Sequence, residues 1–288
     1  MIYAYRILSV LIIGMSMLMC AQMIKKSEQS NHERIETMSN QSQSKWLDVI
    51  NASKNVGAFT AKDKFSSPVI IEWKILGTTS PDFAPTMRSI ADLATHAFTS
   101  VELQFLQQHP QAMTTEGLYQ DNLAEFQNQG TQFDWQGIEN KIASIISNLY
   151  TTMDWSKFGG DDRYIFAMIK DEKGGLLGFI TFFVRPSYAY GDCKVTAMGI
   201  MPAAQNRGLG KLLMSSIFEI IRQIQRIFLS TRVTNVKAIA AYRSWGFVID
   251  KNPMQEPGHT FNPDYWIFME YRTEQTKILQ EAARTLVK

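Results

Sequence analysis

The sequence predicts an α/β protein, a mixed twisted sheet with helices packed against it. Residues 195–221 pass from an apolar, uncharged strand through a glycine-rich turn into an amphipathic helix. Two apolar runs, 163–170 and 176–184, flank the loop DEKGG, which is typical of a β-hairpin. Residues 137–150 carry isoleucines and leucines at helical spacing. Segments with the periodicity of strands thus alternate along the chain with segments that have helical periodicity, which indicates the α/β class.

The central segment predicts its own boundaries. Pro202 ends the strand Val195–Met201, because proline cannot donate to a sheet ladder. The turn Gln205–Gly210 follows, and from Leu209 onward apolar residues recur every three or four positions. A strand, a glycine turn and a helix start can together hold an anion; the alternative is an ordinary strand-to-helix turn. The first helical turn has unpaired N–H groups, and glycine lets a phosphate approach them closely.

The other elements are predicted in chain order from the same two periods. A first strand spans Pro68–Gly77, and one helix runs from about Ser80 or Asp82 through Phe105. A strand at Arg226–Val233 follows the central helix, and residues 247–250 and 264–271 form the last pair. Residues 273–288 predict a C-terminal amphipathic helix.

Composition excludes several function classes. The chain has 29 basic and 27 acidic residues, which argues against a nucleic-acid binder that relies on bulk charge. Two cysteines cannot build a disulfide framework, and the four histidines show no ligand spacing. We therefore expect no metal site and no nucleic-acid partner.

Residues 1–26 form an apolar leader, in which positions 7–24 carry no charge. We expect a membrane anchor, with the domain in the cytoplasm on the side of Lys25 and Lys26. The alternatives are a cleaved signal peptide, a lipoprotein attached through Cys20, and a later start at Met23 or Met38. These would give an exported or a soluble cytoplasmic protein. Residues 27–66 predict a polar tether, with a possible short helix over 45–56.

Two motifs resemble the GCN5-related N-acetyltransferase (GNAT) superfamily. The string Met198-Gly199-Ile200-Met201-Pro202-x-x-Gln205-x-x-Gly208-x-Gly210 is similar to its acetyl-CoA signature. Residues 229–235 and 238–247 are similar to its fifth strand, which ends in Asn, and to the following helix with a Gly-Phe exit. The pair is most similar to the branch that acetylates ribosomal-protein N-termini.

The resemblance implies a fold of six to seven strands with helices on both faces, spanning residues 67–272. It implies an N-acetyltransferase that moves an acetyl group from acetyl-CoA to a primary amine in a ternary complex. The acceptor would be a small molecule or a peptide. The long segment between the first two strands of the fold would select it. The sequence leaves the acceptor, the acyl-chain length and the oligomeric state open.

The resemblance also assigns roles. The backbone of Gln205, Asn206, Arg207, Gly208, Leu209 and Gly210 would bind the pyrophosphate, with Arg207 adding charge. The edge at Met198, Gly199 and Ile200 would pair with the pantetheine arm and supply an oxyanion donor. Asn235 would hold that arm or, alternatively, cap a helix. Tyr242 would protonate the leaving thiolate or, alternatively, be one more buried aromatic residue.

The general base is not evident. The ribosomal branch often has a glutamate five residues before the Asn, where this chain has Ser230. Either a carboxylate elsewhere (Glu72, Glu102 or Asp192) acts through water, or the free amine reacts directly. This departure also supports the alternative of a non-catalytic acyl-CoA-binding or membrane-tethered interaction module with the same fold.

Overall fold

A computed structural model describes residues 46, 48–112, 127–128, 132–152, 162–185, 187–250 and 262–286. The predicted anchor at 7–24 and the first half of the predicted tether, residues 27–45, lie outside these residues and stay predictions. In the part of the chain that is described, no helix has both the length and the apolar character that a bilayer span requires.

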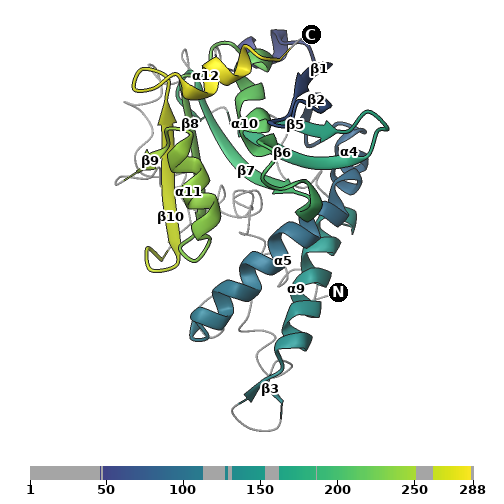
Figure 1. Ribbon diagram of the computed structural model, residues 1–288, viewed down its shortest axis with the longest axis vertical. Coiled ribbons are helices and arrows are strands. Elements are labelled where there is room, and N and C mark those ends of the chain that lie inside the picture. Colours follow the sequence, from purple (N-terminus) through teal and green to yellow (C-terminus); the bar gives the residue numbers. More distant parts are fainter. Residues whose placement is uncertain are drawn as a thin grey trace, which may run out of the picture.

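Strands and helices alternate along the chain, as the sequence predicts (Figure 1). The main strands are β1 (Val56–Lys62), β2 (Pro68–Gly77), β5 (Arg163–Lys170), β6 (Leu176–Val184), β7 (Asp192–Ile200), β8 (Arg226–Arg232), β9 (Val248–Ile249) and β10 (Trp266–Arg272). The helices are α4 (Phe83–Ser89), α5 (Ala91–Gln108), α9 (Trp135–Thr152), α10 (Leu209–Ile220), α11 (Val236–Ser244) and α12 (Ile278–Ala283). A small separate pair consists of β3 (Gln127–Asn128) and β4 (Gln132–Phe133), and a 3-10 turn, η3 (Pro202–Ala204), follows β7.

The main sheet has eight strands in the order β1-β2-β5-β6-β7-β8-β10-β9. Only β7 and β8 are parallel neighbours, because α10 connects them as a crossover; the other described pairs are antiparallel. The mixed class is confirmed, but the sheet has one strand more than the six to seven predicted. The extra strand is β1, which lies in the segment that the sequence assigned to the tether.

Strand β1 was missed because its residues, VGAFTAK, have small and polar members and little apolar alternation. It gains its stability from pairing along its whole length with β2. The predicted helix before the second strand is also divided, since the backbone departs from helical geometry at Ile90. The predicted short helix over 45–56 appears at residues 48–52.

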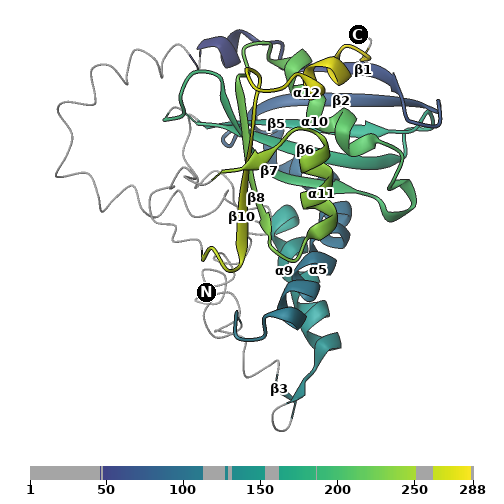
Figure 2. The ribbon, with the colours of Figure 1, turned by 60° about the vertical axis from the view of Figure 1, so that its left-hand side comes forward.

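Helices cover both faces of the sheet (Figure 2). Helix α10 packs against β5, β6 and β7, and α12 packs on α10. Helix α5 packs against β7 and β8 from the other face, with α9 beside it. Gly199 shows how close α5 comes: a Cβ added there would lie 2.6 Å from Leu93 Cδ2 and 3.1 Å from Ala97 Cβ.

Strands β7 and β8 pair only at their first three residues. Asp192, Cys193 and Lys194 lie opposite Arg226, Ile227 and Phe228, and beyond them the strands diverge (Figure 1). A register shift at Thr181/Phe182 on the other side of β7 leaves Thr196 without a counterpart on β6, and such a bulge bends a strand. The sheet therefore has a V-shaped opening whose closed end lies at Asp192 and Arg226.

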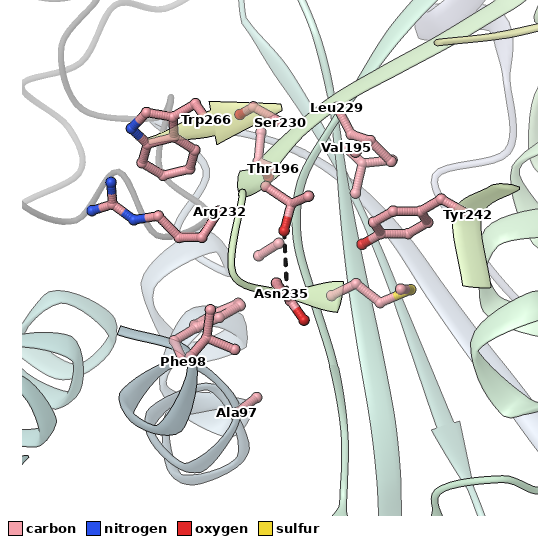
Figure 3. A pocket seen from close by; sticks show the side chains of 14 residues that line it. Ala97, Phe98, Val195, Thr196, Leu229, Ser230, Arg232, Asn235, Tyr242 and Trp266 are labelled. Carbon is pink, nitrogen blue, oxygen red and sulfur yellow. Dashed lines mark hydrogen bonds between the residues drawn. The ribbon is translucent and has the colours of Figure 1, made fainter. Parts of the chain in front are cut away.

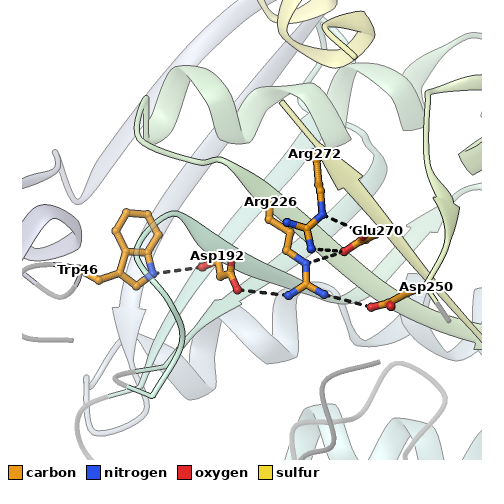
Figure 4. Close-up of polar contacts among 6 residues, drawn as sticks. All are labelled: Trp46, Asp192, Arg226, Asp250, Glu270 and Arg272. Carbon is orange, nitrogen blue, oxygen red and sulfur yellow. Dashed lines mark hydrogen bonds and ion pairs between the residues drawn. The ribbon is translucent and has the colours of Figure 1, made fainter. Parts of the chain in front are cut away.

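Charged side chains form ion pairs at the closed end of the V-shaped opening (Figure 4). The Arg226 guanidinium contacts Asp192 Oδ2 at 3.4 Å, Asp250 Oδ2 at 3.0 Å and Glu270 Oε2 at 2.8 Å. Arg272 adds a second cation on Glu270. Burial acts to raise the pKa of Glu270, but hydrogen bonds and charge from Arg272 and Arg226 bring the pKa below its usual value. At Asp192, burial outweighs Arg226 and raises the pKa.

The residues before β1 are docked at the same place. The indole N–H of Trp46 donates to the Asp192 carbonyl oxygen at 3.1 Å, and the Trp46 side chain is fully buried. Its ring centroid lies 5.2 Å from that of Tyr190. The folded unit thus begins at least as early as residue 46, ahead of the boundary at 67 that the sequence predicted.

Candidate functional site

A cavity of about 80 Å³ lies in the opening between β7 and β8. Its walls come from both faces of the sheet and from both diverging strands (Figure 3). The lining residues are Ala97, Phe98 and Val101 of α5, residues 195–198 of β7, residues 229–232 of β8, Asn235, Tyr242 of α11 and Trp266 of β10. The cavity therefore connects the α11 side of the sheet with the α5 side.

The glycine turn stands at the start of α10 with unused hydrogen-bond donors. Among the described residues, the backbone N–H groups of residues 206–210 find no acceptor, whereas Gln205, Lys211 and Leu212 donate to nearby carbonyls. Asn206 and Gly208 adopt left-handed φ values of 64° and 78°, a kind of conformation in which consecutive amides can converge on an anion. These amides are thus available to a ligand, and their predicted role in binding a pyrophosphate stays a prediction.

The sequence predicts that Arg207 offers its charge to the pyrophosphate, but in the structure its guanidinium is paired with Asp63. Its Nε donates to Asp63 Oδ2 at 2.6 Å, and the Asp63 carboxylate is fully buried. Burial acts to raise the pKa of Asp63, but the Arg207 hydrogen bond and two backbone N–H donors bring the pKa below its usual value. Because this carboxylate already balances the guanidinium charge, Arg207 offers a ligand its backbone more than its charge.

Tyr242 projects its hydroxyl into the cavity (Figure 3), although only 8% of the residue's surface is exposed. The ring is held by Trp245 and Phe247, with centroids 5.6 Å away in each case. Burial raises the pKa of the phenol well above its usual value. The hydroxyl therefore stays protonated at neutral pH, as a proton donor must.

Asn235 occupies the N-cap of α11 and faces the cavity as well. Its Oδ1 accepts from the Ala238 N–H at 3.4 Å, and its Nδ2 donates to Thr231 Oγ1 at 3.2 Å. The capping alternative is therefore present in the structure. The capping bond is long, and the side chain still borders the cavity.

Of the three residues predicted to form the strand edge at the site, only one lines the cavity. Met198 lines the cavity, whereas Gly199 is buried against α5 and Phe179 and serves close packing. Ile200 ends β7 opposite Gly178 of β6, away from the diverging side. Leu209 and Gly210 are likewise packed inward: the Leu209 side chain is in the core, and a Cβ on Gly210 would lie 3.1 Å from the Trp245 ring.

Sequence reasoning missed the ion pair at the far end of the cavity. Arg232 Nε and Nη2 donate to the two carboxylate oxygens of Glu102 at 2.7 and 2.8 Å. Both side chains are almost fully buried, at 2% and 0% exposure. The guanidinium is sandwiched between Phe105 and Trp266, 3.9 and 4.1 Å from their ring centroids. One signal was available, namely an arginine at the end of an otherwise uncharged strand interior.

None of the three predicted carboxylates lines this cavity. Glu72 pairs with Lys170 at 2.6 Å, Asp192 belongs to the closed end of the V, and Glu102 is held by Arg232. Ser230, which stands where the ribosomal branch often has glutamate, does line the cavity. Among the described residues, no group of three or more His, Cys, Asp or Glu side chains could hold a metal ion.

Comparison with known protein families gives a match, and comparison with curated proteins gives none. The model of the acetyltransferase (GNAT) family matches residues 123–247. A search of the curated proteins finds no significant match.

Among solved structures, the ribosomal-protein-S18-alanine N-acetyltransferase from Escherichia coli is 21% identical, with a TM-score of 0.30. That match covers 38% of this chain and 68% of the other. Spermidine N-acetyltransferase from Vibrio cholerae, in complex with CoA and spermine, is 14% identical, with a TM-score of 0.35. That match covers 70% of this chain and 96% of the other. Both TM-scores lie below 0.5. The match to the acetyltransferase (GNAT) family model spans 125 of the 288 residues and contains β7, the glycine turn, α10 and α11.

Proposed function

We propose that the protein is an N-acetyltransferase that transfers an acetyl group from acetyl-CoA to a primary amine in a ternary complex. The observation that carries this proposal is the opening between β7 and β8. It contains a cavity with the Tyr242 hydroxyl in its wall and has a turn of unused amides beside its strand. Such an opening can admit an extended arm between the strands and an acceptor from the opposite face.

The described residues fit the donor at both of its ends. The amides of 206–210 present several N–H donors together at the positive end of the α10 dipole, which suits a diphosphate. The side of β7 that faces β8 has no strand partner from Val195 onward. Backbone groups there can pair with the amides of a pantetheine arm, much as an added strand pairs with a sheet edge.

The chemistry follows from the same groups. A backbone N–H on the open edge of β7 can donate to the thioester oxygen as negative charge develops on it. The amine nitrogen forms a bond to the acetyl carbon, and the carbon–sulfur bond breaks. Tyr242, a neutral phenol at the cavity wall, gives its proton to the departing thiolate. The nitrogen loses one proton to solvent as the amide forms, and the tyrosinate regains a proton from solvent.

Deprotonation of the amine is assigned to no side chain. The described cavity residues include hydroxyl, amide and apolar groups and one guanidinium, and no carboxylate. We therefore propose that the neutral fraction of the amine reacts directly. Turnover should then rise with pH up to the pKa of the acceptor amine itself. The acceptor is proposed only as a primary amine, because Ser230 stands where the ribosomal branch often has its base.

A two-part experiment tests the proposal. Calorimetry should show binding of CoA to the wild-type chain, and incubation of acetyl-CoA with a panel of small and peptide amines should release thiol above background. Absence of CoA binding would overturn the donor assignment. Binding without thiol release for any amine would favour a non-catalytic acyl-CoA-binding module instead.

A further inference from the structure

The turn between β1 and β2, residues 63–67, lies directly against the glycine turn. The Lys64 N–H donates to the Arg207 carbonyl at 3.0 Å, and Arg207 Nε donates to Asp63 at 2.6 Å. A Cβ added to Gly208 would lie 3.8 Å from Lys64 Cβ. Two turns that are about 140 residues apart in sequence thus form one surface at the start of α10.

The Asp63 side chain makes this turn rigid. Its Oδ1 accepts from the N–H groups of Phe65 and Ser67, each at 2.9 Å, while Oδ2 receives Arg207. The main chain closes the turn with a bond from the Asp63 N–H to the Ser67 carbonyl at 2.9 Å. A carboxylate that bonds its own backbone in this way fixes the direction of the residues between.

The two residues at the tip point away from the core. The Phe65 side chain is 65% exposed, the joint highest exposure among the large apolar residues described. Lys64 Nζ lies 5.0 Å from the Phe65 ring centroid. In the part of the chain that the structure describes, Lys64 forms no ion pair with a carboxylate. Asp63, the nearest acid in sequence, is already occupied by Arg207.

We infer that residues 63–67 form the outer part of the donor site, where Phe65 stacks on the adenine of coenzyme A and Lys64 pairs with a phosphate. This inference rests on the proposed function. It uses the chemistry of the ligand's nucleotide end, which offers a flat aromatic base and phosphate charge. An exposed phenyl ring provides a stacking face for such a base, and a neighbouring ammonium provides the charge that Arg207 no longer offers.

The test compares three ligands on four variants of the full chain. Phe65→Ala removes the ring, and Phe65→Tyr keeps it. Lys64→Gln removes the charge beside the glycine turn, and Lys54→Gln removes an equally exposed charge ahead of β1, at the strand's opposite end. Calorimetry measures the dissociation constant of CoA, and steady-state kinetics gives KM for acetyl-CoA and for acetyl-pantetheine, which lacks the nucleotide.

Phe65→Ala should raise the dissociation constant of CoA about fivefold or more, which is the lower end for loss of one base–aromatic stack. Lys64→Gln should weaken CoA binding about threefold and make it less sensitive to salt. Phe65→Tyr and Lys54→Gln should stay near wild type, and KM for acetyl-pantetheine should not change in any variant.

Unchanged CoA affinity in both Phe65→Ala and Lys64→Gln would overturn the inference while leaving the proposed function intact. Equal losses for acetyl-CoA and acetyl-pantetheine would overturn it as well, because they would show a general disturbance of the site. Failure of the wild-type chain to bind CoA would instead overturn the proposed function.

Discussion

Burial sets the chemistry of Tyr242. Its ring packs among Trp245 and Phe247, while its hydroxyl reaches the cavity between the two diverging strands. An ionised phenol would lose its hydration in such a place, so the pKa rises and the neutral form persists at physiological pH. Burial thus keeps the phenol neutral but makes it a weaker acid, so its proposed role depends on its position at the cavity and not on the pKa shift.

Tyr242→Phe should lower kcat by about 100-fold, the lower range for loss of a general acid. The ring remains, so the dissociation constant of CoA should stay within twofold of wild type. Thiol release and calorimetry measure the two quantities, with Tyr190→Phe at an exposed position as the control. A Tyr242→Phe enzyme with wild-type turnover would remove this residue from the mechanism.

Arg232 and Glu102 show the cost of a buried charge. Each satisfies the other through two hydrogen bonds, and aromatic rings enclose the guanidinium. Glu102→Leu should lower the free energy of unfolding by about 3–5 kcal/mol, because it leaves the arginine buried and unpaired.

The double variant Glu102→Leu/Arg232→Met should recover part of that loss, since it removes both charges together. Urea denaturation of the two variants measures the difference. A double variant less stable than Glu102→Leu would contradict this explanation. It would show that the loss of stability in Glu102→Leu does not come from the unpaired charge of Arg232.

At the scale of elements, the glycine turn requires a left-handed backbone conformation at Gly208. Gly208 has φ of 78°, and nothing lies closer than 3.8 Å to the position of an added Cβ. Gly174, in the turn between β5 and β6, has φ of 84° and no atom within 4 Å of an added Cβ. The two glycines therefore carry a similar conformational constraint, but only one belongs to the proposed donor site.

Gly208→Ala and Gly174→Ala should each lower the free energy of unfolding by about 1–2 kcal/mol, because an L-residue is strained at positive φ. Only Gly208→Ala should also weaken CoA binding, by shifting the amides of residues 206–210. Calorimetry and urea denaturation on both variants separate the two effects. Equal CoA affinities would argue against these amides as the diphosphate site.

At the scale of the whole molecule, the V between β7 and β8 is closed by residues from distant parts of the chain. Arg226 joins carboxylates of three different segments, and Trp46 adds a hydrogen bond from the region before the first strand. This arrangement ties the N-terminal residues to the strand that forms one wall of the proposed site.

A chain that begins at residue 45 should keep the stability of the full chain's folded unit. A chain that begins at residue 56 should lose about 3–5 kcal/mol, which is typical of removing a fully buried tryptophan. Urea denaturation of the two truncated chains measures this. Equal stabilities would mean that Trp46 and Ile50 contribute nothing to the fold despite their complete burial.

The sequence by itself determined the class of the fold and the strand–turn–helix segment, whereas the roles of Asn235 and Tyr242 came from the family resemblance and stay proposals. These depend on local patterns: alternation, helical spacing, a proline stop and glycines in a turn. Only the tertiary structure decided that β1 joins the sheet, that Asp63 takes the charge of Arg207, and that Arg232 meets Glu102 beside the cavity. Each of these pairs joins residues that are distant in sequence, and a local pattern contains no information about which distant partner will satisfy a strand edge or a buried charge.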